Sequence, residues 1–71
     1  MTPHELQALR RQTVTTVERA GSLLSIGRTL SYQLAREGEL AEGVRVLRVG
    51  RKLVVPVRPL LVALGYEEEA E

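Results

Sequence analysis

The chain contains no cysteine, phenylalanine or tryptophan, and this composition limits how its 71 residues can be held together. Without cysteine there is neither a disulfide nor a thiolate zinc site, and a reducing, intracellular environment is expected. A chain of this length can bury only one small core. We therefore expect one small folded domain whose core is aliphatic and built from leucine and valine.

Charge is distributed unevenly along the sequence. Four of the nine acidic residues are glutamates within the last five positions, 67–71. Residues 1–64 carry all ten lysines and arginines against five glutamates, a formal charge of +5. Between residues 43 and 58 there are five basic residues and no acidic one after Glu42, and they are Arg45, Arg48, Arg51, Lys52 and Arg58. This distribution is typical of a protein that binds a polyanion.

The residue inventory argues against catalysis, metal binding and membrane insertion. There is no cysteine, no aspartate and no phosphate-binding glycine loop, and the single histidine, His4, cannot assemble a metal site alone. No apolar run reaches the roughly 20 residues that span a bilayer, and residues 1–12 are polar rather than signal-like. We expect a cytoplasmic protein that is not an enzyme, with no cofactor, no metal, no membrane contact and no small-molecule substrate.

A helix is expected close to the N-terminus. Thr2 can cap it, Pro3 suits its first position and Glu5 completes a capping box. The helix should run over residues 3–12. Because it is too short to be stable alone, it should pack on the rest of the domain.

The next segment is expected to enter a second helix. Residues 13–16 should be extended, with Thr15 or Thr16 as the N-cap of a helix that runs to about Leu24. Apolar spacing predicts that its buried side is formed by Val17, Ala20 and Leu24. Residues 25–27 would form a tight turn after it.

A third helix is predicted over residues 28–37, between an N-cap at Gly27 and a left-handed C-cap at Gly38. Its inward side would be formed by Leu30, Leu34 and Ala35. Helical periodicity gathers five side chains capable of contacting DNA onto the other face, and they are Arg28, Thr29, Tyr32, Gln33 and Arg36. A solvated polar helix face is the alternative explanation of this pattern.

The second half of the chain predicts a β-hairpin. After a loop through residues 40–43, the runs 44–49 and 52–55 are rich in β-branched residues, and Gly50 and Arg51 between them are typical of a two-residue turn of the primed type. Pro56 should end the second strand. A last short helix would then start at residue 57 or 58 and end at Gly65, followed by an acidic, solvated tail.

The expected fold is therefore mainly α with a small β-hairpin, in the order helix, helix-turn-helix, hairpin, helix. In a helix-turn-helix protein the second helix enters the major groove. Arg28 or Arg36 can bond guanine O6 and N7, and Gln33 can pair with adenine. Three further side chains of this helix can reach a phosphate or a thymine methyl group, and they are Thr29, Ser31 and Tyr32.

The predicted hairpin adds a second basic element. Arg48 and the tip residues Gly50, Arg51 and Lys52 can enter a minor groove or lie along phosphates. The alternative is an edge strand that basic side chains protect from aggregation. Two basic elements flanking one short loop favour nucleic-acid binding more strongly than either element does alone.

These motifs, in this order, resemble the excisionase family of MerR-like winged helix-turn-helix proteins over residues 13–65. The resemblance is carried by six stretches of the sequence: Thr13-Val14, the run from Leu23 to Thr29, Tyr32, the run from Arg36 to Leu40, the run from Arg48 to Lys52, and Val55-Pro56. It implies a winged helix-turn-helix domain at 13–65. Outside this domain, we expect residues 1–12 to contain an N-terminal helix packed on it and residues 66–71 to form an acidic tail.

Membership of this family would imply a small phage recombination directionality factor. Such a protein binds adjacent sites on double-stranded DNA cooperatively, bends the DNA and directs a phage integrase toward excision. The third helix would then be the recognition helix and Gly50 to Lys52 the wing. The partners implied are duplex DNA, an integrase and neighbouring copies along the DNA.

Two features depart from the family pattern. Gly27 stands where the family often has a serine that caps the helix and contacts phosphate, and the minimal domain lacks the N-terminal helix. The same domain also occurs in small transcription regulators, so that function is the alternative within DNA binding. A protein-interaction module whose basic hairpin binds an acidic partner is the alternative from another class.

Overall fold

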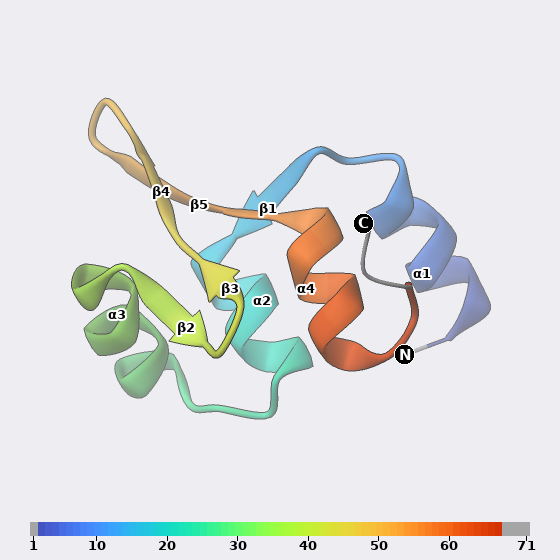
Figure 1. Cartoon of the computed structure of the whole chain (residues 1–71), viewed down its shortest axis with the longest axis horizontal. Helices are drawn as coiled ribbons and strands as arrows, with labels where there is room; N and C mark the ends of the chain where they lie inside the picture. The colour runs from blue at the N-terminus through green and yellow to red at the C-terminus, as the bar shows by residue number, and fades with distance from the viewer. Residues whose placement is uncertain (1, 68–71) are drawn as a thin grey trace.

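In the computed structural model, which describes residues 2–67, a three-stranded antiparallel sheet is built around β5 (Lys52–Pro56) (Figure 1). This strand pairs on one side with β1 (Val14–Thr16) and on the other with β4 (Leu47–Val49). The register places Thr15 opposite Val55 and Arg48 opposite Leu53. The valines of β5 suit a central strand because β-branched side chains pack well on a pleated, half-buried surface.

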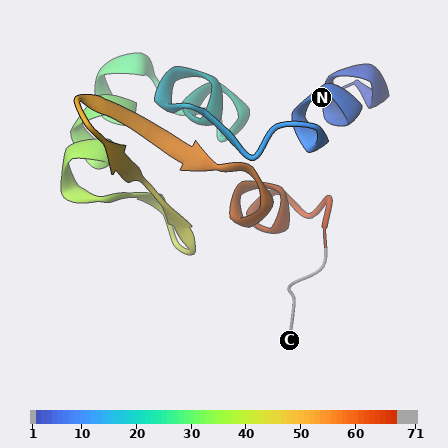
Figure 2. The same ribbon diagram turned by 90° about the horizontal axis from the view of Figure 1, so that it is seen from above.

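Four helices are described, together with a second, smaller sheet. The helices are α1 (Pro3–Arg10), α2 (Val17–Leu23), α3 (Arg28–Glu37) and α4 (Val57–Leu64), and the small sheet pairs β2 (Glu39–Ala41) with β3 (Val44–Arg45). In two perpendicular views, α3 and the free end of the β4–β5 hairpin lie on one side of the molecule and α1 lies on the other (Figures 1 and 2). The described chain is a mixed α/β fold and contains more strand than the mainly α prediction.

The core is aliphatic, as the composition requires. Its most buried members come from every helix and from three strands, and they are Leu9, Val17, Ala20, Ala35, Leu40, Val44, Val55, Val57, Leu60 and Leu61. Leu9 brings α1 into this core, and α1 packs against α4. None of the described helices is both long enough and apolar enough to cross a membrane.

Helix ends follow local chemistry closely. The Glu5 N–H donates to Thr2 Oγ1 at 3.2 Å and starts α1, which ends at Arg10, two residues before the predicted end. α3 spans the predicted residues, between an N-cap at Gly27 and a C-cap at Gly38 with φ of 97°. α4 ends at Leu64 and is followed by a C-cap at Gly65 with φ of 86°. These ends were predictable because each depends on residues within one turn of the helix.

The N-cap of α2 gives a first testable prediction. The Arg19 N–H donates to Thr16 Oγ1 at 3.1 Å, so Thr16 is the cap residue. Thr16→Ala removes this acceptor and should lower the free energy of unfolding by about 1 kcal/mol, measured by urea denaturation. Thr13→Ala is the control because the Thr13 side chain is exposed and its backbone carbonyl, which accepts from Val57 N–H, is unchanged. Equal losses in both variants would contradict a capping role.

The hairpin turn is confirmed, and the strand before it requires a correction. Val49 pairs with Lys52 across the two-residue loop, and Gly50 has φ of 61°. A positive φ at the first loop residue alone is the type II′ geometry. The predicted strand over residues 44–49 is interrupted at Val46, whose N–H donates to the Gly38 carbonyl at 2.9 Å. Its two halves therefore belong to different sheets.

Residues 40–43 do not form the expected loop. Leu40 is buried in β2, and a tight turn with Gly43 at φ of 81° leads to Val44 in β3. This short hairpin packs on the core through Leu40 and Val44, which are both buried. A three-residue strand is too short for an alternation of polar and apolar residues to be recognised in the sequence. The conformation of this segment is therefore set by its packing on the rest of the domain.

Three apolar residues are less buried than predicted. Leu30 was expected to face inward but is 45% exposed, while Leu34 and Leu24 are only half-buried. Leu30 lies on the flank of α3, and the inward positions of this helix are taken by Ser31 and Ala35. The small residues face inward because α2 approaches α3 closely at this point, as described below.

The start of the acidic tail is bound to the N-terminal helix. Glu67 Oε1 lies 2.6 Å from Arg10 Nε, and Arg10 Nη2 donates to the Tyr66 carbonyl at 3.2 Å. Glu67 is therefore not the free, solvated residue that the sequence predicted. The rest of the predicted tail, residues 68–71, lies outside the described residues.

Candidate nucleic-acid interface

α3 presents a polar face to solvent. Helical geometry places residues separated by three, four and seven positions on one side, and the exposed members of this set are Thr29, Tyr32, Gln33 and Arg36. Arg28 extends the face at its N-terminal end, with a side chain that is 77% exposed. The structure thus leaves accessible five of the six residues predicted on this helix.

The sixth residue, Ser31, is not accessible, and its predicted contact with DNA is wrong. It is 1% exposed, and its Oγ donates to the Gly27 carbonyl at 2.8 Å. Ser31 faces Gly21 of α2 so closely that a Cβ at Gly21 would lie 1.9 Å from Ser31 Oγ. Ser31 is therefore a packing residue, and its position four residues before the buried Ala35 was the sequence signal for this role.

The free end of the β4–β5 hairpin carries the predicted basic residues. Arg48, Gly50, Arg51 and Lys52 are all exposed. Side chains on paired strands alternate between the two faces of the ribbon, so Arg48 projects on the face of its partner Leu53, and Lys52 on the face of its partner Val49. The hairpin therefore presents positive charge on both faces.

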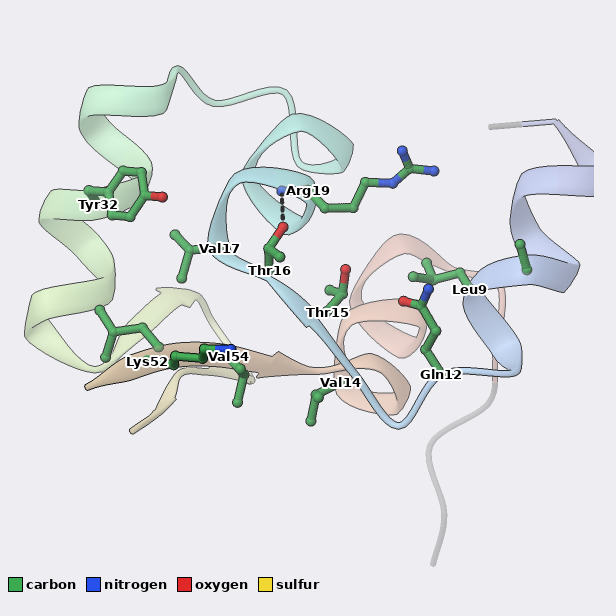
Figure 3. A pocket seen from close by; sticks show the side chains of 12 residues that line it. Leu9, Gln12, Val14, Thr15, Thr16, Val17, Arg19, Tyr32, Lys52 and Val54 are labelled. Carbon is green, nitrogen blue, oxygen red and sulfur yellow. Dashed lines mark hydrogen bonds between the residues drawn. The ribbon is translucent and has the colours of Figure 1, made fainter. Parts of the chain in front are cut away.

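The hairpin and α3 share two surface depressions. Arg36 lines one of them together with Arg48 and Arg51. Tyr32 lines the other together with Lys52 (Figure 3). Side chains of the helix face and of the hairpin are therefore brought together on one side of the molecule, although Arg36 and Arg48 are twelve positions apart in sequence.

The depression in Figure 3 continues away from α3 toward α1. Its wall includes the Thr16 cap of α2, Gln12 and Leu9, and the Arg19 side chain points along it toward α1 (Figure 3). Arg19 is an exposed cation that the sequence interpretation did not assign. Arg19 is difficult to single out in the sequence, because an arginine in the first turn of a short helix has no distinctive spacing from other basic residues.

Glu18 is a second residue that the sequence did not single out. One oxygen of its carboxylate, Oε1, lies 2.9 Å from Arg28 Nη2 and accepts a hydrogen bond from Tyr32 Oη at 3.0 Å. The hydrogen bond to Glu18 raises the pKa of the Tyr32 phenol, aided by desolvation and by the negative charge of Glu18, while Arg28 acts in the opposite direction. The Glu18 carboxylate thus contacts two residues of the polar face of α3, Arg28 and Tyr32.

This surface is otherwise cationic. Its basic members from α3 and the hairpin are Arg28, Arg36, Arg48, Arg51 and Lys52, against two carboxylates, those of Glu18 on α2 and of Glu37 in the last turn of α3. Within residues 2–67, no three histidine, aspartate or glutamate side chains come together to hold a metal ion. The arrangement suits the binding of an extended polyanion through positive charge and hydrogen-bond donors.

Comparisons of the chain with protein-family models, with curated proteins and with solved structures find no significant match. What the chain can bind must therefore be inferred from its surface and from the resemblance in sequence described above.

Proposed function

We propose that the chain is a sequence-specific DNA-binding protein of the winged helix-turn-helix type. In this proposal α2 and α3 form the helix-turn-helix, α3 enters the major groove and the β4–β5 hairpin is the wing. The observation that carries it is the shared depression of Arg36, Arg48 and Arg51, which joins the exposed face of α3 to the basic hairpin. A single duplex lying on this side of the molecule can engage both elements.

The residue types on α3 suit the major groove, where each base pair presents a distinct pattern of donors and acceptors. Arg28 or Arg36 can donate two hydrogen bonds to guanine, and Gln33 can pair with adenine. Arg51 and Lys52 can lie along phosphates or enter the minor groove. Gly50 has no side chain, so the hairpin tip allows a close approach of its backbone to the duplex.

We further propose that the DNA-binding activity serves phage recombination, with the chain acting as an excisionase. The support is the sequence resemblance over residues 13–65, which implies cooperative binding to adjacent sites, bending of the DNA and an integrase as protein partner. The alternative of a small transcription regulator would use the same interface. The two differ in their effect on an integrase.

Base reading by Gln33 is the first test of DNA recognition. Sites selected from a pool of random duplexes should show an adenine preference that Gln33→Ala relaxes by about tenfold at one position, because a bidentate contact contributes roughly 1–3 kcal/mol of discrimination. Affinity for random duplexes should change little. Gln7→Ala is the control, because Gln7 is an exposed residue of α1, and this helix lies on the opposite side of the molecule from α3 (Figure 1). Binding that does not weaken with added salt would contradict the proposal.

An excision reaction with the cognate integrase separates the two roles. With purified integrase and DNA carrying the attachment sites of the integrated phage, addition of the chain should stimulate excision and suppress integration. Intact DNA binding without any effect on recombination would assign the chain to transcription regulation. No binding to any duplex would exclude both roles.

A further inference from the structure

The Glu18 carboxylate occupies an unexpected place for a DNA-binding surface. It is the only acidic residue between positions 13 and 36, yet it projects from the first turn of α2 onto the exposed face of α3. There its Oε1 contacts Arg28 and Tyr32, at 2.9 Å and 3.0 Å. On its own, a carboxylate at this position opposes the approach of a phosphate.

Stability alone does not account for this cluster. The Glu18 and Arg28 side chains are 48% and 77% exposed, and ion pairs at such exposure contribute little to folding. The carboxylate does, however, restrict where the Arg28 guanidinium can lie. An arginine on a helix surface otherwise samples many rotamers and loses that freedom when it binds.

Arg28 keeps the donors that base recognition needs. A guanidinium has five N–H donors in a planar fork, and the contact with Glu18 is made through Nη2. The remaining donors still include a pair that matches two acceptors, as presented by O6 and N7 of guanine. Tyr32, in contrast, donates its one hydroxyl proton to Glu18, so its oxygen can only accept, for example from the amino group of cytosine or adenine.

We propose that Glu18 is a positioning residue that holds Arg28 for the recognition of a guanine and keeps the Arg28–Tyr32 pair from binding phosphate indiscriminately. The inference rests on the proposed DNA-binding function and assigns a base to one residue of α3. Glu18 would therefore increase sequence discrimination and decrease affinity for random DNA. Those two effects have opposite signs, which distinguishes them from a general loss of binding.

Site selection from random duplexes tests this with two variants. Arg28→Ala should remove a guanine preference at one position by about tenfold, the size expected for a bidentate contact. Glu18→Ala should relax the preference at that same position by about two- to fivefold, the range of an exposed ion pair. Glu18→Ala should also bind random duplexes about two- to fivefold more tightly, because a negative charge facing the DNA is removed.

Glu37→Ala is the matched control. It removes the same charge from the exposed C-terminal turn of α3, where Glu37 is not a partner of Arg28 or Tyr32. It should increase affinity for random duplexes without changing the guanine preference. The inference is wrong if Glu18→Ala retains the full guanine preference that Arg28→Ala loses. A wild-type protein that selects no sequence at all would instead overturn the proposed function itself.

The tyrosine provides a readout that does not depend on DNA. The chain has two tyrosines, so a Tyr66→Phe background leaves Tyr32 as the only phenol to titrate. In that background Glu18→Ala should lower the pKa of Tyr32 toward its ordinary value of about 10, because the hydrogen-bond acceptor is removed. Glu37→Ala should leave this pKa unchanged. An unchanged Tyr32 pKa in Glu18→Ala would show that the cluster does not form and would overturn the inference.

Discussion

Replacing Gly21 by alanine is expected to lower the free energy of unfolding by about 2–3 kcal/mol, the upper range for overpacking a core. Gly21 is buried in α2, and an added Cβ would lie 1.9 Å from Ser31 Oγ and 2.8 Å from Ser31 Cβ. Ser31 cannot move aside, because it is buried and its hydroxyl is bonded to the Gly27 carbonyl. The two helices would have to separate.

This loss is large for so small a domain, whose total stability is roughly 4–10 kcal/mol. Thermal unfolding should show a fall in Tm of about 10 °C or more. Ser22→Ala is the control, because Ser22 is the next residue on the same helix and is exposed. A double-mutant cycle with Ser31→Gly identifies the cause, since the substitution at Gly21 should cost little once Ser31 has no side chain. A similar cost in both backgrounds would rule out the predicted clash.

α3 shows what the sequence could predict. Its bounds of Arg28 and Glu37 depend on Gly27, on Gly38 and on the period of the residues between them, all of which are local. The hairpin turn at Gly50 is equally local, because a two-residue loop with a glycine at its first position leaves few alternatives. Arg48, Arg51 and Lys52 could be predicted at the end of the hairpin for the same reason.

Features that depend on contacts between distant segments were missed. The pairing of β1 with β5 joins residues about forty positions apart, and neither β1 nor β2 is longer than three residues. Ser31 was predicted to reach DNA because a hydroxyl can contact a phosphate, whereas Gly21 in the neighbouring helix makes the space that buries it. The spacing of four residues between Ser31 and Ala35 favours burial of Ser31, but the space beside Gly21 comes from the packing of α2 on α3.

Glu18 was missed for a related reason. It is ten positions before Arg28 and fourteen before Tyr32, and only the angle between α2 and α3 brings its carboxylate to both. The close approach at Gly21 helps to define that angle. The packing of Gly21 against Ser31 and the contacts of Glu18 on the polar surface therefore both depend on how α2 lies against α3.

Replacing Arg48 and Arg51 together by alanine is expected to weaken binding to any duplex by about 30-fold at physiological salt, since each phosphate contact is worth roughly 1 kcal/mol. The two arginines line the same depression as Arg36 and are exposed, so their loss should leave folding unchanged. The slope of log K against log salt should decrease in magnitude by about 1.8, because two counterion-releasing contacts are lost. Fluorescence anisotropy over a salt series measures both quantities.

The control is the double substitution Arg11→Ala and Arg58→Ala, which removes the same charge from exposed positions at the end of α1 and on α4. If binding depended only on net charge, the two double variants would lose affinity equally. If the hairpin is the wing, Arg48 and Arg51 contact phosphates directly, and their removal alone lowers the number of counterions released. A hairpin that merely protects a sheet edge would leave the salt slope unaltered, because edge protection requires charge and no contact with DNA.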